Sequence, residues 1–141
     1  MMIDEKMIQK AVGERLRTIG FSVTANEVTE GFKKPTTFVT VMPVKSELLN
    51  SFRENLVVSV TITYHSQKGT PEECADAAIK IRKGFAYEPL IVAERKLTIE
   101  NMEFDNENNV LYAFFDLDFI QETTNTEDAD DTFAELEMEG L

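Results

Sequence analysis

Several residue types and patterns are scarce in this 141-residue sequence, and each scarcity excludes a class of protein. Cys74 is the single cysteine, so the chain has no internal disulfide, and we expect a reducing, cytoplasmic setting. No apolar run approaches the ~20 residues that a membrane-spanning helix needs, so no membrane partner is expected. The amino terminus MMIDEKMIQK lacks a basic region followed by an apolar one, which predicts that no signal peptide is present.

Side chains that carry catalysis or bind metals are equally scarce. His65 is the one histidine, and without a second histidine it builds no zinc site, so we interpret it as a solvent-facing residue. Asp116 and Asp118 lack a third metal ligand, and Cys74 is predicted to be a buried apolar residue. The sequence has neither a glycine-rich phosphate loop nor a serine nucleophile elbow. We therefore expect no catalysis, no metal and no cofactor.

The charge is strongly negative and unevenly distributed. The net charge is −12, and residues 121–141 hold eight acidic residues and no lysine or arginine. The other 18 acidic residues face 14 basic ones in residues 1–120, which leaves that part of the chain at −4. A nucleic-acid-binding surface needs clustered Lys and Arg to displace counterions from phosphates. The charge balance therefore argues against a specific nucleic-acid partner.

Two long segments alternate in polarity and predict the central strands of a sheet. In residues 55–65, every second residue from Leu56 to Tyr64 is apolar, and residues 110–120 repeat the pattern from Leu111 to Phe119. The opposite side of the second strand carries Tyr112 and Phe114 before its aspartates. That side is therefore predicted either to be covered by a helix or to form an interface with another copy.

Two helices are predicted from apolar residues spaced by three to five positions. The first covers residues 3–19, and Gly20 is placed to end it in a left-handed conformation. The second begins at Thr70, which can cap it, while Pro71 suits the first helical position and Glu73 is expected to bond back to the Thr70 N–H. Its buried residues are predicted to be Cys74, Ala77, Ala78, Ile81 and Phe85.

The remaining segments are less regular. Residues 21–25 and 36–42 predict short strands, the second of which is closed by Pro43. Residues 96–104 predict a strand with a bulge near Glu100, followed by a turn over 105–109.

Residues 44–54 carry Leu48, Leu49 and Phe52 and allow two interpretations. They form either one helical turn or the tip of a long hairpin arm. As an arm they would need a partner surface, and otherwise these side chains would fold back on the core.

Together these elements predict an α+β domain over residues 1–120. Two helices pack on one face of a mainly antiparallel sheet of four to five strands. Residues 121–141 are predicted to be a flexible acidic tail with a short apolar segment that includes Phe133 and Leu136. That segment either docks on a neighbouring copy or remains solvated.

Several stretches together resemble the tail terminator family of tailed bacteriophages and prophages. They are EVTEGFKKPTTFVTV (27–41), the strand end ITYH (62–65), the acidic start of the second helix and LYAFFDLDF (111–119), with FAELE (133–137) as a weaker echo. The resemblance implies a structural virion protein without catalysis that forms a ring, commonly sixfold, on the head-proximal end of the tail tube. Such a ring stops tube polymerisation and presents a surface to head-completion proteins.

The resemblance also implies partners and an interface. The expected partners are copies of the chain itself, the tail-tube protein and a head-completion or neck protein, with assembly in the bacterial cytoplasm from copies that can be monomers in solution. A head–tail connector, or a small dimeric ligand-binding or regulatory domain, is the alternative. The predicted interface residues are Gly31, Phe32, Pro35, Leu48, Leu49, Phe52, Tyr112, Phe114, Phe133 and Leu136.

Overall fold

The computed structural model describes residues 2–24 and 32–122, which contain two helices and six strands. The elements are α1 (Glu5–Thr18), β1 (Thr36–Asn50), β2 (Arg53–His65), α2 (Pro71–Ala86), β3 (Leu90–Val92), β4 (Arg95–Leu97), β5 (Met102–Glu107) and β6 (Val110–Glu122). This arrangement confirms the predicted α+β class. The predicted interface residues Gly31, Phe133 and Leu136, and all but the first two residues of the predicted tail, lie outside the described ranges.

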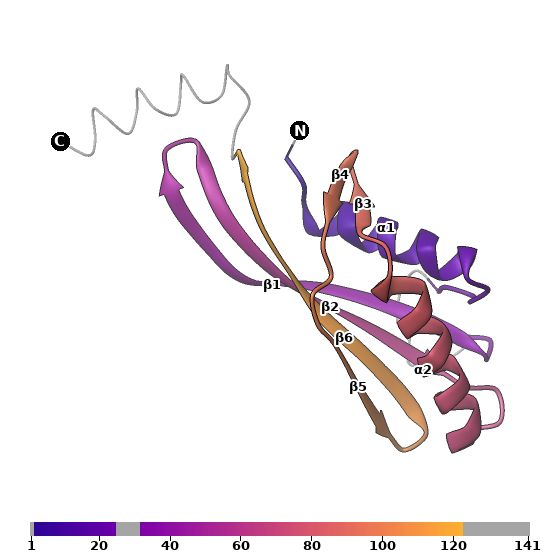
Figure 1. Ribbon diagram of the computed structural model, residues 1–141. Coiled ribbons are helices and arrows are strands. Elements are labelled where there is room, and N and C mark those ends of the chain that lie inside the picture. The colour runs from indigo at the N-terminus through magenta and orange to yellow at the C-terminus, as the bar shows by residue number, and fades with distance from the viewer. Residues whose placement is uncertain (1, 25–31, 123–141) are drawn as a thin grey trace.

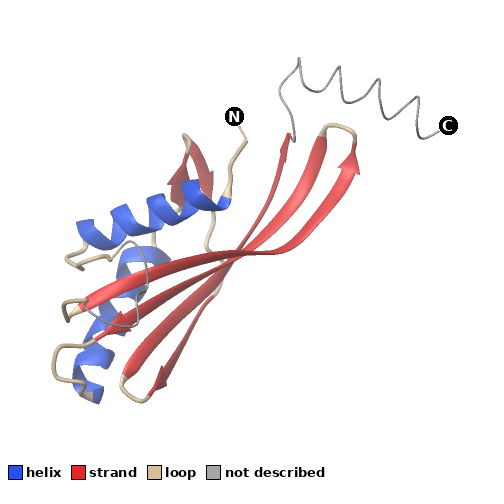
Figure 2. Cartoon of the chain, turned by 180° about the vertical axis from the view of Figure 1, so that it is seen from behind, coloured by secondary structure: helices blue, strands red, loops and turns tan. Residues whose placement is uncertain are grey.

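A four-stranded antiparallel sheet in the order β1-β2-β6-β5 forms the body of the protein. β2 is paired along its length with β1 on one side and β6 on the other, as expected of a long central strand. Figures 1 and 2 place α1, α2 and the β3–β4 hairpin on the same side of this twisted sheet. The alternate apolar residues of β2 and β6 are buried on that side, among them Val58, Val60, Ile62 and Leu117.

Local capping fixes both helices. The Asp4 carboxylate accepts the Met7 N–H at 2.9 Å at the start of α1, and Gly20 follows its end with φ at 104°. At the start of α2, the Thr70 hydroxyl accepts the Glu73 N–H at 3.3 Å. The predicted return bond from Glu73 to Thr70 is wrong, because the Glu73 carboxylate accepts from the Lys68 N–H at 3.2 and 3.3 Å.

The first strand of the sheet does not close at Pro43 as predicted, because β1 continues to Asn50. Proline lacks a backbone donor, and edge strands tolerate it because their outer side needs no ladder bond. β1 is an edge strand, and its register with β2 shifts between Pro43 and Lys45. Residues 44–54 are therefore the tip of a long hairpin and not a helical turn.

The predicted strand over 96–104 is also wrong. β4 ends at Leu97 and pairs with β3 in a separate two-stranded sheet, whereas β5 begins at Met102 and pairs with β6. The change of parity in the sequence marks the passage from one sheet to the other and not a bulge.

Two further connections are shorter than predicted. The turn before β6 consists of Asn108 and Asn109, whose φ angles of 53° and 61° suit a two-residue hairpin turn. The sequence also predicts a strand over residues 21–25, but the described part of this segment contributes only one parallel bridge, Val23 to Thr37.

Candidate interaction site

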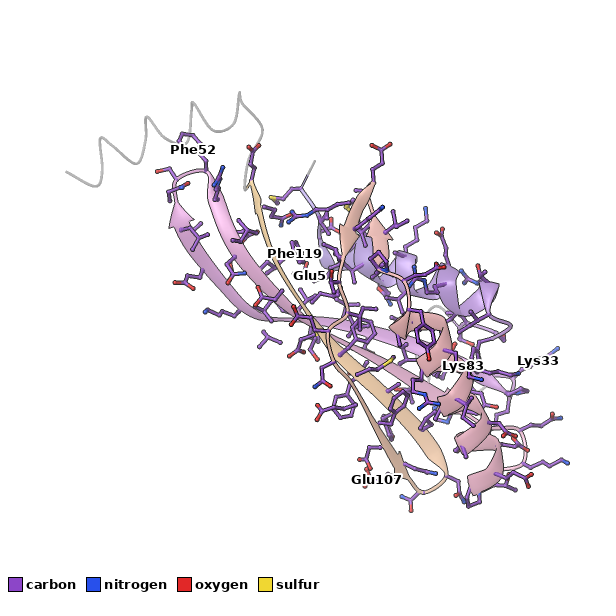
Figure 3. All side chains as sticks on the ribbon, in the orientation of Figure 1. Glu5, Lys33, Phe52, Lys83, Glu107 and Phe119 are labelled. Atoms are coloured by element: carbon purple, nitrogen blue, oxygen red, sulfur yellow. The ribbon has the colours of Figure 1, made fainter. Side chains whose placement is uncertain are left out.

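The hairpin of β1 and β2 extends past the helices as an arm, defined here as residues 42–56 (Figure 1). Phe52 lies at its tip, at the opposite end of the sheet from Glu107 (Figure 3). Leu48 is 71% exposed, and Leu49 and Phe52 are each 47% exposed, so these side chains do not fold back on the core. Met42 and Val44 are exposed as well. The arm thus carries five large apolar side chains that are exposed by between about half and three quarters of their surface.

Polar contacts hold the arm in its hairpin conformation. The Phe52 N–H donates to the Asn50 side-chain oxygen at 2.8 Å, which fixes the turn. The Ser46 hydroxyl donates to Glu54 across the two strands at 2.8 Å, and the Gln121 amide of β6 donates to the same carboxylate at 3.1 Å. The exposed apolar residues are therefore presented on a defined scaffold.

The sheet side opposite the helices, called here the open face, carries the second group of predicted interface residues. Phe38, Thr63 and Tyr112 form one cross-strand row, and Thr61 and Phe114 belong to the next. Tyr112 and Phe114 are partly exposed. No helix among the described residues covers them (Figures 1 and 2). Of the two predictions for this side, the structure therefore does not show the cover by a helix.

An aromatic cluster occupies one end of the open face. The ring centroids of Phe32 and Phe38 are 5.1 Å apart, and the His65 ring lies 4.9 Å from Phe32 and 5.4 Å from Phe38. Phe38 is consequently 2% exposed although it lies on the open face. The interpretation of His65 as a solvent-facing residue is therefore wrong, because its ring packs against two phenylalanines. Phe32 is part of this cluster, and Pro35 is exposed just before β1.

Acidic residues border the apolar part of the open face. Asp105 and Glu103 of β5 pair with Tyr112 and Phe114, and Asp116 and Asp118 follow along β6. Within residues 2–24 and 32–122, no three His, Cys, Asp or Glu side chains gather where they could hold a metal ion. The open face therefore combines aromatic side chains with a negative margin.

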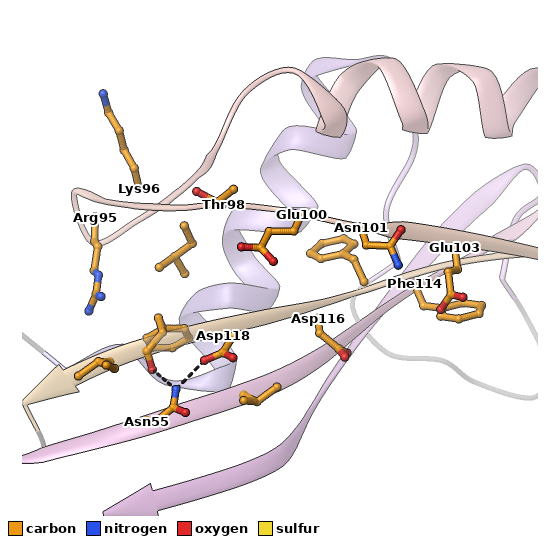
Figure 4. Close-up of a pocket in the computed structure, with 15 residues that line it drawn as sticks. Asn55, Arg95, Lys96, Thr98, Glu100, Asn101, Glu103, Phe114, Asp116 and Asp118 are labelled. Atoms are coloured by element: carbon orange, nitrogen blue, oxygen red, sulfur yellow. Dashed lines mark hydrogen bonds between the residues drawn. The ribbon is translucent and has the colours of Figure 1, made fainter. Parts of the chain in front are cut away.

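A hollow of about 730 Å³ runs along the outer edge of β6 and is called here the β6 groove (Figure 4). It exists because β5 pairs with β6 only as far as Phe115, while β6 continues to Glu122. Residues 95–101 form the far wall, and the Arg95 guanidinium lies 5.5 Å from the Phe119 ring centroid.

Side chains from both sides of the sheet line the β6 groove. Phe115 and Phe119 belong to the buried side, whereas Asp116, Asp118 and Ile120 belong to the open face. Asp118 accepts a hydrogen bond from the Asn55 amide at 2.6 Å. Because residues from both sides of β6 line this hollow, it lies at the edge of the strand, in the place that a further strand would take. Sequence reasoning missed this groove, because the predicted strand over 96–104 would have filled it.

Two titratable side chains on the helix side of the sheet have shifted pKa values. Burial raises the pKa of the Cys74 thiol, and the nearby Glu73 carboxylate adds to the rise, while a hydrogen bond with Ser66 opposes it. The thiol donates to the Asn109 carbonyl at 3.3 Å and is 1% exposed, as predicted for a buried residue. Burial also raises the pKa of Tyr64, with Glu73 as the next cause. These groups belong to the core and not to an exposed reactive site.

The predicted interface residues that the structure describes thus fall into two groups, the arm tip and the open face with its aromatic end. A scan against protein families matches residues 7–130 to the family described as phage tail terminator protein. The chain belongs to the phage tail terminator family. The match covers most of the chain and confirms the resemblance found in the sequence.

Membership of this family makes the protein a phage tail component that interacts with other tail proteins. The search of curated proteins returned no match for the chain. Among the described residues, neither helix combines the length and the apolar character needed to cross a membrane.

Proposed function

We propose that this tail terminator closes into a ring of identical copies on the head-proximal end of the tail tube. The ring stops the addition of tube subunits and offers its other side to a head-completion or neck protein. One side of the ring resembles a tube subunit and binds the last tube ring, and the other side lacks the complementary surface. The resemblance suggests sixfold symmetry, and the copies assemble in the cytoplasm of the bacterial host.

The observation that carries this proposal is the exposed arm. Leu48, Leu49 and Phe52 are held away from the core in a hydrogen-bonded hairpin. Fully burying a large apolar side chain contributes about 1.5–3 kcal/mol, and these three side chains are about half to seven-tenths exposed, so they offer roughly 2–5 kcal/mol per copy before the cost of association. A contact that joins different surfaces of identical chains generates a ring when the rotation closes. The arm is therefore suited to repeated head-to-tail contacts.

The electrostatics of the chain fit a structural role in a DNA-conducting tail. A net charge of −12 repels DNA phosphates at short range, so genomic DNA can pass without binding to the wall. The role needs no catalysis and no cofactor. The segment with Phe133 and Leu136 is proposed to dock on a neighbouring copy, beyond the acidic linker that follows β6.

Tail length is the decisive measurement. Electron microscopy of tails made without this protein should show overlong tubes if it terminates them. Normal tails detached from heads would instead indicate the connector alternative. A mass measurement that detects no complex with purified tube protein would favour the ligand-binding or regulatory alternative.

A matched pair of triple variants tests the arm itself. Leu48→Ser, Leu49→Ser and Phe52→Ser together should abolish termination without unfolding the protein. The control changes three large apolar residues that are equally exposed on the helix side, Ile79→Ser, Tyr87→Ser and Ile91→Ser. If the control disrupts termination and the arm variant does not, the role assigned to the arm is wrong.

A further inference from the structure

The two halves of the sheet differ in whether their outer edges are covered. In the half near His65, residues 22–24 lie along β1, with the Thr37 N–H donating to Ser22 at 2.8 Å and the Thr24 N–H donating to Thr37 at 2.9 Å. In the same half, β5 covers β6 from Val110 to Phe115. The acidic side chains of β5 in turn protect its own outer edge from pairing.

The half that contains the arm has no such cover. There, residues 53–59 of β2 lie between residues 42–50 of β1 and residues 116–122 of β6. Among residues 2–24 and 32–122, no other strand pairs with the outer side of either stretch. Both outer edges are therefore at the same level along the sheet, because both stretches pair with the same seven residues of β2. Unpaired edges of this kind are templates for a strand from another chain.

We propose that the β1 edge of the arm of one copy adds as a parallel strand to β6 in the groove of the next copy. This inference rests on the proposed ring and specifies the contact that closes it. β1 and β6 are both antiparallel to β2, so they run parallel to each other. A rotation about an axis that runs along the strands preserves the direction of each strand and the position of each residue along that axis. It therefore brings the β1 edge of one copy beside the β6 edge of its neighbour without any shift along the axis.

The charges match in the register that this rotation gives. Lys45 and Asp118 both pair with Val57 within one copy, so they share one level and both lie on the open face. In the ring, Lys45 of one copy faces Asp118 of the next. The Lys45 ammonium now lies 3.0 Å from Glu47, and both side chains are more than half exposed, so it is free to exchange partners.

The apolar side chains of the arm also fall on the correct side. Leu48 pairs with Glu54, which shares the buried side of β2 with Leu56. In the joined sheet Leu48 is diagonal to Phe119, whose ring lines the groove. Cross-strand and diagonal pairs of this type are what stabilise a sheet. The proposed contact thus buries an exposed leucine against an aromatic side chain already in place.

The charge of the groove argues against the acidic carboxyl-terminal segment as its occupant. Four of the lining residues are acidic and two are basic, namely Glu100, Glu103, Asp116, Asp118, Arg95 and Lys96. Residues 121–141 carry eight acidic residues and no basic one, so they would be repelled. The arm stretch 42–50 carries one lysine and one glutamate and is neutral.

A disulfide pair tests the contact directly. Lys45→Cys and Asp118→Cys in one chain cannot bridge within a copy, because β2 separates them by about 9.6 Å and a disulfide tolerates at most ~7 Å between Cα atoms. Mild oxidation with copper phenanthroline of the full chain, assembled alone or on purified tail tubes, should give a ladder of covalent oligomers that ends at the ring size. Each single variant should give dimers at most. Cys74 is 1% exposed and should not contribute.

Two further cysteine pairs separate the possible occupants. Lys45→Cys with Asp105→Cys uses the outer edge of β5 in the other half of the sheet and should give no ladder. Asp118→Cys with Asp131→Cys should not close within one chain, and a monomeric disulfide there would place the carboxyl-terminal segment in the groove and overturn the inference. A ladder of equal yield from the Asp105→Cys pair would overturn it as well.

Charge reversal provides a second test. If Lys45 and Asp118 only stabilised the fold of a single copy, the double reversal would not restore the contact between copies. Lys45→Asp and Asp118→Lys should each reduce the ladder formed by a chemical cross-linker, and the double reversal should restore it. Rings that form on tubes without a Lys45→Cys/Asp118→Cys ladder would refute strand addition and leave the proposed function intact. If no ring forms even on tubes, the proposed function fails, and this inference fails with it.

Discussion

The side-chain amide of Gln121 forms hydrogen bonds with both backbone polar groups of Ile3. Its Oε1 accepts the Ile3 N–H at 2.7 Å, and its Nε2 donates to the Ile3 carbonyl at 3.0 Å. The same Nε2 donates to Glu54 at the root of the arm. Gln121 lies near the end of β6 and Ile3 precedes α1, so one buried side chain joins the amino-terminal segment, the last strand and the arm.

Replacement of this side chain by an apolar one should destabilise the fold. In Gln121→Leu, the buried N–H and carbonyl of Ile3 lose their partners. We expect the free energy of unfolding to fall by about 2–6 kcal/mol, since each of the two orphaned groups costs roughly 1–3 kcal/mol. Urea unfolding followed by circular dichroism measures this loss. Glu122→Leu, at the exposed neighbouring position, should stay within ~0.5 kcal/mol of the natural protein, and equal losses in both variants would contradict the assignment.

The aromatic cluster on the open face should contribute as much to the free energy of unfolding as an equally buried residue of the core. Phe38→Ala removes the ring that contacts Phe32 and His65, and a buried Phe→Ala change costs about 3–5 kcal/mol. Thr40→Ala is the matched control, because Thr40 is exposed on the same side of the same strand. Thermal and urea unfolding compare the two variants. A loss from Phe38→Ala no larger than that from Thr40→Ala would mean that the cluster is not packed in solution.

The central strands and both helices were predictable because one side of each is buried. Burial imposes alternation on β2 and β6 and a stripe on each helix, and the sequence records those constraints directly. The capping residue Thr70 and the terminating Gly20 are equally local signals. These elements depend on neighbours a few residues away, so a single sequence suffices to find them.

The interaction surfaces were less predictable because they depend on which strands pair and for how long. Pro43 is typical of a strand end, and nothing in the sequence says that β1 is an edge strand that tolerates it. The parity change near Glu100 has the same pattern whether it reflects a bulge or a passage between sheets. The β6 groove follows from the shortness of β5, which is a tertiary property. Leu48, Leu49 and Phe52 were identified as a group, but their exposure required the structure.

The close approach of the two helices at Gly84 gives a further prediction. A Cβ atom at this position would lie 2.7 Å from Ile19 Cδ1 and 3.0 Å from its Cγ2. Gly84→Val should therefore destabilise the protein, because it forces Ile19 away from its place at the end of α1. Overpacking of this kind typically costs 1–3 kcal/mol, measured by urea unfolding.

Arg82→Val is the control for this variant, since Arg82 is exposed on the same helix and its change tests only the helix propensity of valine. Adding Ile19→Ala to Gly84→Val should recover part of the loss that Gly84→Val causes. Purely additive effects in this double variant would show that the two side chains do not collide.

Stability should fall at alkaline pH because of Cys74 and Tyr64. Burial, as the largest cause, raises both pKa values above their ordinary values of 9.0 and 10.0. Well below pH 9 both groups are neutral in the folded and the unfolded chain, so they leave stability unchanged. As the pH rises through this range the unfolded chain loses the protons first, and each group lowers the free energy of unfolding by up to about 1.4 kcal/mol per pH unit until its folded pKa is reached.

Urea midpoints between pH 7 and 11 measure this alkaline loss. Cys74→Ala should remove the part that begins near pH 9, and Tyr64→Phe should remove the part that begins near pH 10, because alanine and phenylalanine have no proton to lose. Each variant is compared with its own value at pH 7, which separates the slope from the cost of the lost contacts. If Cys74→Ala combined with Tyr64→Phe keeps the full alkaline slope, other groups cause the loss and the assignment to these two residues is wrong.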